Sequence, residues 1–123
     1  MIRRAILATV LVAFASQPAL ARTLTTGLIF PDGDNELVCS VINVDPSREV
    51  VVRIDAVDFD GDVVSHTPVN SLLPGEVAGL NVAADEGAQY CRFELVQGSR
   101  RSVRASGCVF THGTGCLFST NAS

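Results

Sequence analysis

Residues 57–64, VDFDGDVV, space three carboxylates at alternate positions around one glycine: Asp58, Asp60 and Asp62. Carboxylate oxygens are the ligands that hard cations such as calcium prefer. The helical D-x-D-x-D-G calcium loop also needs glycine at its sixth position and glutamate at its twelfth, where a count from the first aspartate finds Val63 and Val69. That motif is excluded, and the Asp-Gly pair between two apolar runs instead predicts the turn of a β-hairpin.

Histidine is the side chain that most often moves protons in catalysis, and the chain has two, His66 and His112, on separate segments. Ser65 precedes the first histidine, but neighbours on a strand point to opposite faces and cannot form a nucleophile–base pair. The sequence contains no nucleophile elbow, phosphate loop or HExxH motif. We therefore expect a protein that is not an enzyme and that uses no cofactor.

The first 21 residues have the three parts of a secretory signal peptide: two arginines, an apolar run and the small-residue cleavage site Ala19-Leu20-Ala21. The apolar run is shorter than the roughly 20 residues that span a bilayer, and Gln17-Pro18 interrupts it. We predict a signal peptide at 1–21 and a single mature domain at 22–123. The mature chain is then periplasmic or secreted and has no membrane span.

Charge and cysteine content narrow the possible partners. Removal of Arg3 and Arg4 changes the formal net charge from −4 to −6, and the chain has no lysine, which disfavours nucleic acid. Four cysteines in an exported chain predict two disulfides, and the absence of a CxxC pair disfavours a zinc or thioredoxin-like site.

Turn-forming residues recur about every ten positions between valine-rich alternating runs, which is typical of an all-β sandwich or barrel. The pattern predicts strands at 24–30, 36–44, 49–58, 62–66, 76–82, 89–97, 101–110 and 115–119. Alternation within 49–58 and 89–97 indicates how these two strands pair. If they are antiparallel with paired residue numbers summing to 147, Arg53 faces Glu94, Asp55 faces Arg92, and the apolar residues face one another.

Matching apolar residues and opposite charges across the next pair of segments predicts a hairpin between 89–97 and 101–110. Its loop has three residues, 98–100. In that register Leu95 faces Val103, and Glu94 faces Arg104 on the outer side. Three neighbouring strands would then follow the order 49–58, 89–97, 101–110.

This order matches the C, F and G strands of an immunoglobulin-like sandwich, and other residues support the resemblance. DEGAQYC, residues 85–91, resembles the D-x-G-x-Y-x-C corner of immunoglobulin domains, with Tyr90 displaced by one position and no core tryptophan. CSVIN, the Asp60-Gly61 turn and LLPGE resemble the immunoglobulin-like modules of exported bacterial proteins. The resemblance covers 39–95 and implies an antiparallel sandwich of about seven strands with two disulfides. It implies no shared active site.

The side of the strand to which each cysteine points favours one of the three possible disulfide pairings. In this register Cys91 points to the core, together with Cys39 on the B strand, whereas Cys108 points outward. We therefore predict the pairs Cys39–Cys91 and Cys108–Cys116.

In such a sandwich the loops PDGDNE, DFDGD and AADEGA lie at one end. They would gather acidic side chains there, and we take five of them as candidate calcium ligands: Asp32, Asp34, Asp58, Asp60 and Asp62. The alternative is that these carboxylates serve solubility and turn formation. The opposite end would carry Arg48, Arg100 and Arg101, a candidate site for a protein or envelope partner.

The function that these patterns favour is an exported binding or structural module. Two alternatives remain open. One is a module stabilised by calcium at the acidic end, and the other is a small secreted protease inhibitor that uses the loop QGSRRS, residues 97–102.

Overall fold

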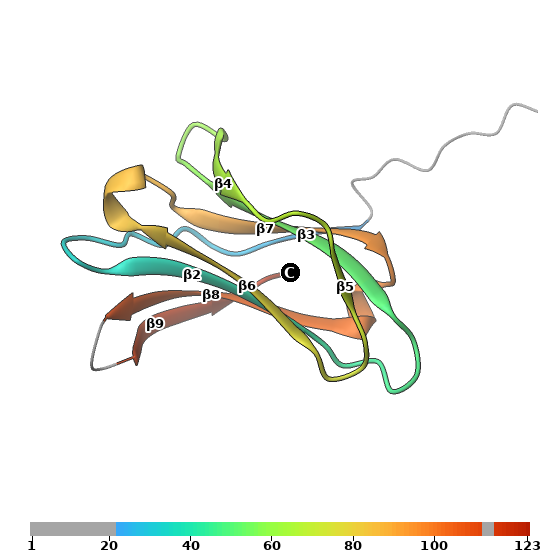
Figure 1. Ribbon diagram of the computed structural model, residues 1–123. Coiled ribbons are helices and arrows are strands. Elements are labelled where there is room, and N and C mark those ends of the chain that lie inside the picture. The colour runs from blue at the N-terminus through green and yellow to red at the C-terminus, as the bar shows by residue number, and fades with distance from the viewer. Residues whose placement is uncertain (1–21, 112–114) are drawn as a thin grey trace, which may run out of the picture.

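The computed structural model describes residues 22–111 and 115–123, so the predicted signal peptide and His112 lie outside the described residues. Over these residues the chain forms nine strands in two antiparallel sheets packed face to face (Figure 1). In the first sheet β1 (Thr23–Thr25), β7 (Tyr90–Gln97), β3 (Val50–Val57) and β4 (Val63–His66) lie in that order, and β5 (Asn70–Leu72) also pairs with β3. The predicted all-β class is confirmed.

The second sheet has the order β6 (Val77–Ala83), β2 (Glu36–Asn43), β8 (Val103–Thr111) and β9 (Gly115–Asn121). Two short 3-10 turns, η2 (Ala84–Glu86) and η3 (Arg100–Ser102), precede β7 and β8. No helix among the described residues is long and apolar enough to cross a membrane.

The core lies between the sheets because the strands alternate in facing. Strand β2 repeats half-buried and buried residues over its whole length, and β7 does so up to Leu95. Leu37, Val41 and Phe93 meet there, almost completely buried. Full burial of such a side chain contributes about 1.5–3 kcal/mol, so these alternating runs account for the pairing of the two layers.

The predicted register of β3 and β7 is confirmed. The structure pairs these strands as the sum of 147 requires: Val52 with Leu95, Arg53 with Glu94, Ile54 with Phe93, and Asp55 with Arg92. A bulge between Val51 and Val52 ends the regular register. The Asp60-Gly61 turn is confirmed as well, since β3 and β4 form a hairpin across it and Gly61 has a φ of 88°.

The predicted hairpin between 89–97 and 101–110 is wrong. Strand β8 pairs with β2 in the second sheet, and β1 takes the place beside β7, with Leu24 opposite Phe93. Arg104 consequently lies opposite Ile42 and not Glu94. Alternation shows which side chains face the core, but both sheets face the same core, so it does not show to which sheet a strand belongs.

The connection 98–102 carries the chain from one sheet to the other. Gly98 has a φ of 113°, a conformation that side-chain-bearing residues rarely adopt. The η3 turn follows, and the Ser102 carbonyl accepts a 2.8 Å hydrogen bond from the amide of Val44, just beyond the end of β2. This bond starts the pairing of β8 with β2.

Other differences from the predicted strands are local. The first strand ends at Thr25 rather than residue 30, and β5 is a ninth strand beside the eight predicted ranges, where the resemblance implied about seven. Asn43, the last residue of β2, is buried and joins the loop between β2 and β3 to the end of β5. Its side-chain amide donates to the carbonyls of Arg48 and Leu72, both at 2.8 Å, while its oxygen accepts from the Asp45 amide.

Candidate functional site

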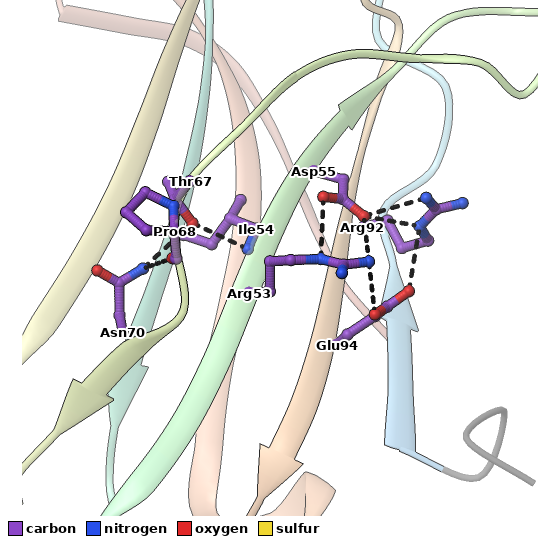
Figure 2. Close-up of polar contacts among 8 residues, drawn as sticks. All are labelled: Arg53, Ile54, Asp55, Thr67, Pro68, Asn70, Arg92 and Glu94. Atoms are coloured by element: carbon purple, nitrogen blue, oxygen red, sulfur yellow. Dashed lines mark hydrogen bonds and ion pairs between the residues drawn. The ribbon is translucent and has the colours of Figure 1, made fainter.

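The outer face of the first sheet carries a closed network of four charged side chains, shown in Figure 2. Arg92 contacts the Asp55 carboxylate at 3.0 Å, and Arg53 contacts Glu94 at 2.7 Å. Arg53 also approaches Asp55, with Nε 3.4 Å from Oδ1, and Arg92 approaches Glu94 at 3.9 Å. Alternate positions on two paired strands place all four on one face.

Burial differs sharply within this network. The Asp55 side chain is 2% exposed, whereas those of Arg53 and Glu94 are 40% and 36% exposed. Each carboxylate is matched by two guanidinium groups, so the network leaves little net charge for a ligand. The two arginines of β3 and β7 are therefore committed to the structure of the sheet.

Next to the network, Thr67 and Asn70 hold the loop between β4 and β5 against β3 (Figure 2). The Ile54 amide donates to the Thr67 hydroxyl at 3.1 Å, and the Thr67 amide donates to the Ile54 carbonyl at 2.9 Å. Asn70 donates to the same hydroxyl and to the Pro68 carbonyl. His66 is exposed and lies opposite Asp55 in the register, and Ser65 lies opposite Ala56.

The remaining arginines of the described chain gather at the end of the sandwich where β3 and β8 begin. We call this the arginine end: Arg22, Arg48, Arg100, Arg101 and Arg104. All five side chains are exposed, and no ion pair within 4 Å joins any of them to a carboxylate among the described residues. The carboxylates at the same end are Asp45, Glu49 and Glu76, so five arginines against three acids leave this end positive although the whole chain is acidic.

Two hollows open at the arginine end. Arg22, Arg48 and Glu49 line one of about 520 Å³, beside Gly98 and Ser99. Arg100 and Arg104 line the other, of about 400 Å³, over an apolar floor that includes Leu24 and Val103. Arg100 is oriented by a 2.9 Å hydrogen bond to the Thr23 carbonyl. The predicted residues Arg48 and Arg100 thus line two hollows, and Arg101 lines neither of them.

Sequence reasoning missed Arg22 and Arg104 as members of this end. Arg22 directly precedes β1, and Arg104 had been assigned to the wrong sheet. The only signal in the sequence was their nearness along the chain to residues that were predicted, such as Arg101. Their positions depend on the pairing of β1 with β7 and of β8 with β2.

Asp45 ties the arginine end together. Its carboxylate accepts hydrogen bonds from the amides of Ser47 and Arg48 and from the Ser102 hydroxyl. The Ser47 and Arg48 amides lower the pKa of Asp45 below its ordinary value of 3.8, with a smaller contribution from the positive charge of Arg48. The side chain is therefore charged near neutral pH and keeps the loop 45–48 against the turn before β8.

The predicted acidic end forms around the loop 31–35 and η2. The Ala84 amide donates to the Asn35 carbonyl at 3.2 Å, and a hollow of about 670 Å³ beside them is lined by Asp34, Glu36 and Asp85. Asp32 accepts a 3.1 Å hydrogen bond from the Asn35 side chain. In the β3–β4 turn, Asp58 Oδ1 accepts from the amides of both Asp60 and Asp62.

These contacts are those of turns. Among residues 22–111 and 115–123, no group of three or more acidic, histidine or cysteine side chains is arranged to hold a metal ion. Of the five predicted calcium ligands, Asp58 and Asp32 use carboxylate oxygens within their own loops. The structure does not test calcium binding at this end, and these contacts favour the alternative given above, that the carboxylates serve turn formation.

Both predicted disulfides are confirmed. Cys39–Cys91 joins β2 to β7 across the core, with a Cα–Cα distance of 5.7 Å, and both cysteines are fully buried. Cys108–Cys116 joins β8 to β9 across the final hairpin. Gly107, opposite Cys39, makes room for the core bridge, because a Cβ there would lie 3.1 Å from the Cys91 sulfur and 2.7 Å from Ile29.

Comparison of the chain with protein-family models, curated proteins and solved structures found no match.

Proposed function

We propose that this protein is an exported, non-enzymatic binding module that holds an anionic protein of the cell envelope at its arginine end. The observation that carries this proposal is the group of five exposed arginines that form no ion pair within 4 Å among the described residues, at an end with two hollows. Guanidinium groups form paired hydrogen bonds with carboxylates. In an acidic chain, such a local positive field steers an acidic partner to one end.

Export and fold class belong to the same proposal. The N-terminal pattern of residues 1–21 and two disulfides support a periplasmic or secreted protein. We also propose that the domain is a variant of the immunoglobulin-like modules of exported bacterial proteins. The disulfide between sheets and the β3–β7 pairing support that relationship, while the pairing of β8 with β2 departs from it.

A pull-down from the envelope fraction tests the binding site. The bait is the oxidised protein, compared with the triple variant Arg48→Gln, Arg100→Gln, Arg101→Gln. We expect the wild-type protein to retain an acidic protein that the triple variant loses by tenfold or more, because three charge-assisted contacts are removed (roughly 1.5 kcal/mol or more each, where a factor of ten is about 1.4 kcal/mol).

The matched control is the triple variant Asp34→Asn, Asp60→Asn, Asp62→Asn at the acidic end. It also changes three charges, and no hydrogen bond among the described residues uses these side chains. We expect this control to retain the partner. Equal retention by the arginine variant, with both variants folded by circular dichroism, would remove the arginine end as the binding site.

A further inference from the structure

Strand β6 forms one edge of the second sheet, and its hydrogen-bonding pattern shows which groups point outward. The Asn43 amide donates to the Glu76 carbonyl at 3.0 Å, and the Ala84 amide donates to the Asn35 carbonyl at 3.2 Å. Bonded and non-bonded pairs alternate along an antiparallel ladder, so the even-numbered residues 76–84 bond to β2. The odd-numbered residues direct their backbone N–H and C=O groups away from the sheet: Val77, Gly79, Asn81 and Ala83.

These outward backbone groups have no protein partner among the described residues, because β6 is the terminal strand of its sheet. All four residues are exposed, and Val77 is 63% exposed. Over seven residues the edge offers four donors and four acceptors at the spacing of a strand. It is a complete template for one more antiparallel strand.

The other sheet edges are shorter, covered or irregular. Strand β1 has three residues, and it is closed by reciprocal bonds between Thr25 and Ser123, at 3.2 and 3.1 Å, and by Arg100 on the Thr23 carbonyl. At β9, the side-chain hydroxyl of Thr120 accepts a hydrogen bond from the Gly27 amide. Strands β4 and β5 have four and three residues. Strand β9 also has seven residues, but its register with β8 shifts between Val109 and Phe110, so β6 is the longest regular edge in the described part of the chain.

Proteins usually guard such an edge with lysine, proline, a bulge or an inward charge. VAGLNVA, residues 77–83, contains no charged residue and no proline, and its pairing with β2 shows no bulge. The absence of every common guard indicates that the edge is paired when the protein functions.

We propose that β6 pairs with β6 of a second copy of this chain, antiparallel and about a two-fold axis at Leu80. The two four-stranded sheets then become one continuous sheet of eight strands. A two-fold axis uses the same surface on both copies and closes the assembly as a dimer.

The strand is self-complementary in that register, where paired residue numbers sum to 160. The outward residues pair with one another, as a new ladder requires: Val77 with Ala83, and Gly79 with Asn81. The partly buried Ala78 and Leu80, which pack against the core, gain apolar neighbours from the other copy. The acidic flanks do not meet, because Glu76 faces Ala84 and Asp85 faces Gly75.

The test is the mass of the protein in solution over a concentration series, by sedimentation equilibrium, on the oxidised protein produced from its full chain. The wild-type protein is expected to form a dimer. Asn81→Lys places two lysines at diagonal positions across the axis and should raise the dimer dissociation constant on the order of tenfold or more. Val96→Lys adds the same charge at an exposed site on β7 and should not change it.

A charge-swap variant tests the register itself. In Gly79→Glu with Asn81→Lys, each lysine faces a glutamate of the other copy, and dimerisation should return. Position 79 accepts a side chain, since its Cβ would lie 3.4 Å from its nearest neighbour, the Cys39 carbonyl oxygen. Recovery in this variant also shows that Asn81→Lys had not simply unfolded the protein.

Three outcomes overturn the proposal. The wild-type protein stays monomeric, the dimer survives Asn81→Lys, or the charge-swap variant does not recover the dimerisation that Asn81→Lys removes. A wild-type protein that stays monomeric and binds an extended peptide along β6 also overturns the proposal. None of these outcomes affects the pull-down at the arginine end, because Arg48, Arg100 and Arg101 are unchanged in every variant.

Discussion

At the scale of single residues, Asp55 differs from the other carboxylates of the chain. It points to the outer face of a sheet and is nevertheless 2% exposed, because Arg53 and Arg92 cover it. Desolvation of a carboxylate is costly, and only contacts with both guanidinium groups offset that cost. Glu94 completes the same network from a half-exposed position, where solvent screens its charge.

Removal of the two carboxylates should therefore have unequal effects. Asp55→Ala is expected to lower the free energy of unfolding by about 2–3 kcal/mol, because it leaves Arg92 without its buried partner. Glu94→Gln, the control on the same network, should cost less than about 1 kcal/mol. Urea unfolding of the oxidised protein measures both. Equal losses would mean that burial of Asp55 does not decide the strength of the network.

At the scale of elements, one disulfide joins the two sheets and the other joins the two strands of a single hairpin. Cys39–Cys91 closes a separation of 52 residues and joins the two sheets inside the core. Cys108–Cys116 closes a separation of 8 residues and ties the β8–β9 hairpin, with Cys108 half-buried and Cys116 exposed. In the loop-closure account the first contributes about 4 kcal/mol and the second about 2.5 kcal/mol.

Exposure predicts the order in which these bridges open. A limited dose of reductant, followed by alkylation and mass spectrometry, should label Cys108 and Cys116 first, because a thiolate must reach the disulfide to attack it. Cys39 and Cys91, both 0% exposed, should be labelled only under denaturing conditions. Simultaneous labelling of all four cysteines in the folded protein would contradict this order.

At the scale of the whole molecule, the charges are divided between two ends. Most carboxylates outside the β3–β7 network occupy the loops around 31–35, 58–62 and 84–86, and five arginines occupy the opposite end together with Asp45, Glu49 and Glu76. The acidic loops are folded by their own hydrogen bonds, as the two amides on Asp58 show. The division therefore provides a field for association at the arginine end and solubility at the other.

Calcium is expected to leave the melting temperature of the oxidised protein unchanged. Asp58 and Asp32 already accept hydrogen bonds within their turns, and the described residues offer no cluster of three ligands. Thermal unfolding in millimolar calcium and then in chelator measures this. A ligand at a hundred times its dissociation constant adds about 2.7 kcal/mol, so a rise of several degrees would contradict the expectation and establish a calcium site.

Much of this architecture could be predicted from local patterns in the sequence. The alternation of apolar and charged residues determines the register of β3 and β7, since a shift of one residue would turn Arg53 and Asp55 into the core. The opposite facing of Cys91 and Cys108 argues against a bridge between them and favours the two disulfides that the structure shows. The Asp60-Gly61 turn follows from the conformational freedom of glycine.

Membership of a sheet was decided only by the tertiary structure. Val103 and Ala105 face the core whether β8 lies beside β7 or beside β2, so their alternation fits both arrangements. Hydrogen bonds between residues far apart in the sequence determine that β8 pairs with β2, such as the one from the Val44 amide to the Ser102 carbonyl. The arginine end and the open edge of β6 both follow from that pairing, and so neither could be located before the sheets were assembled.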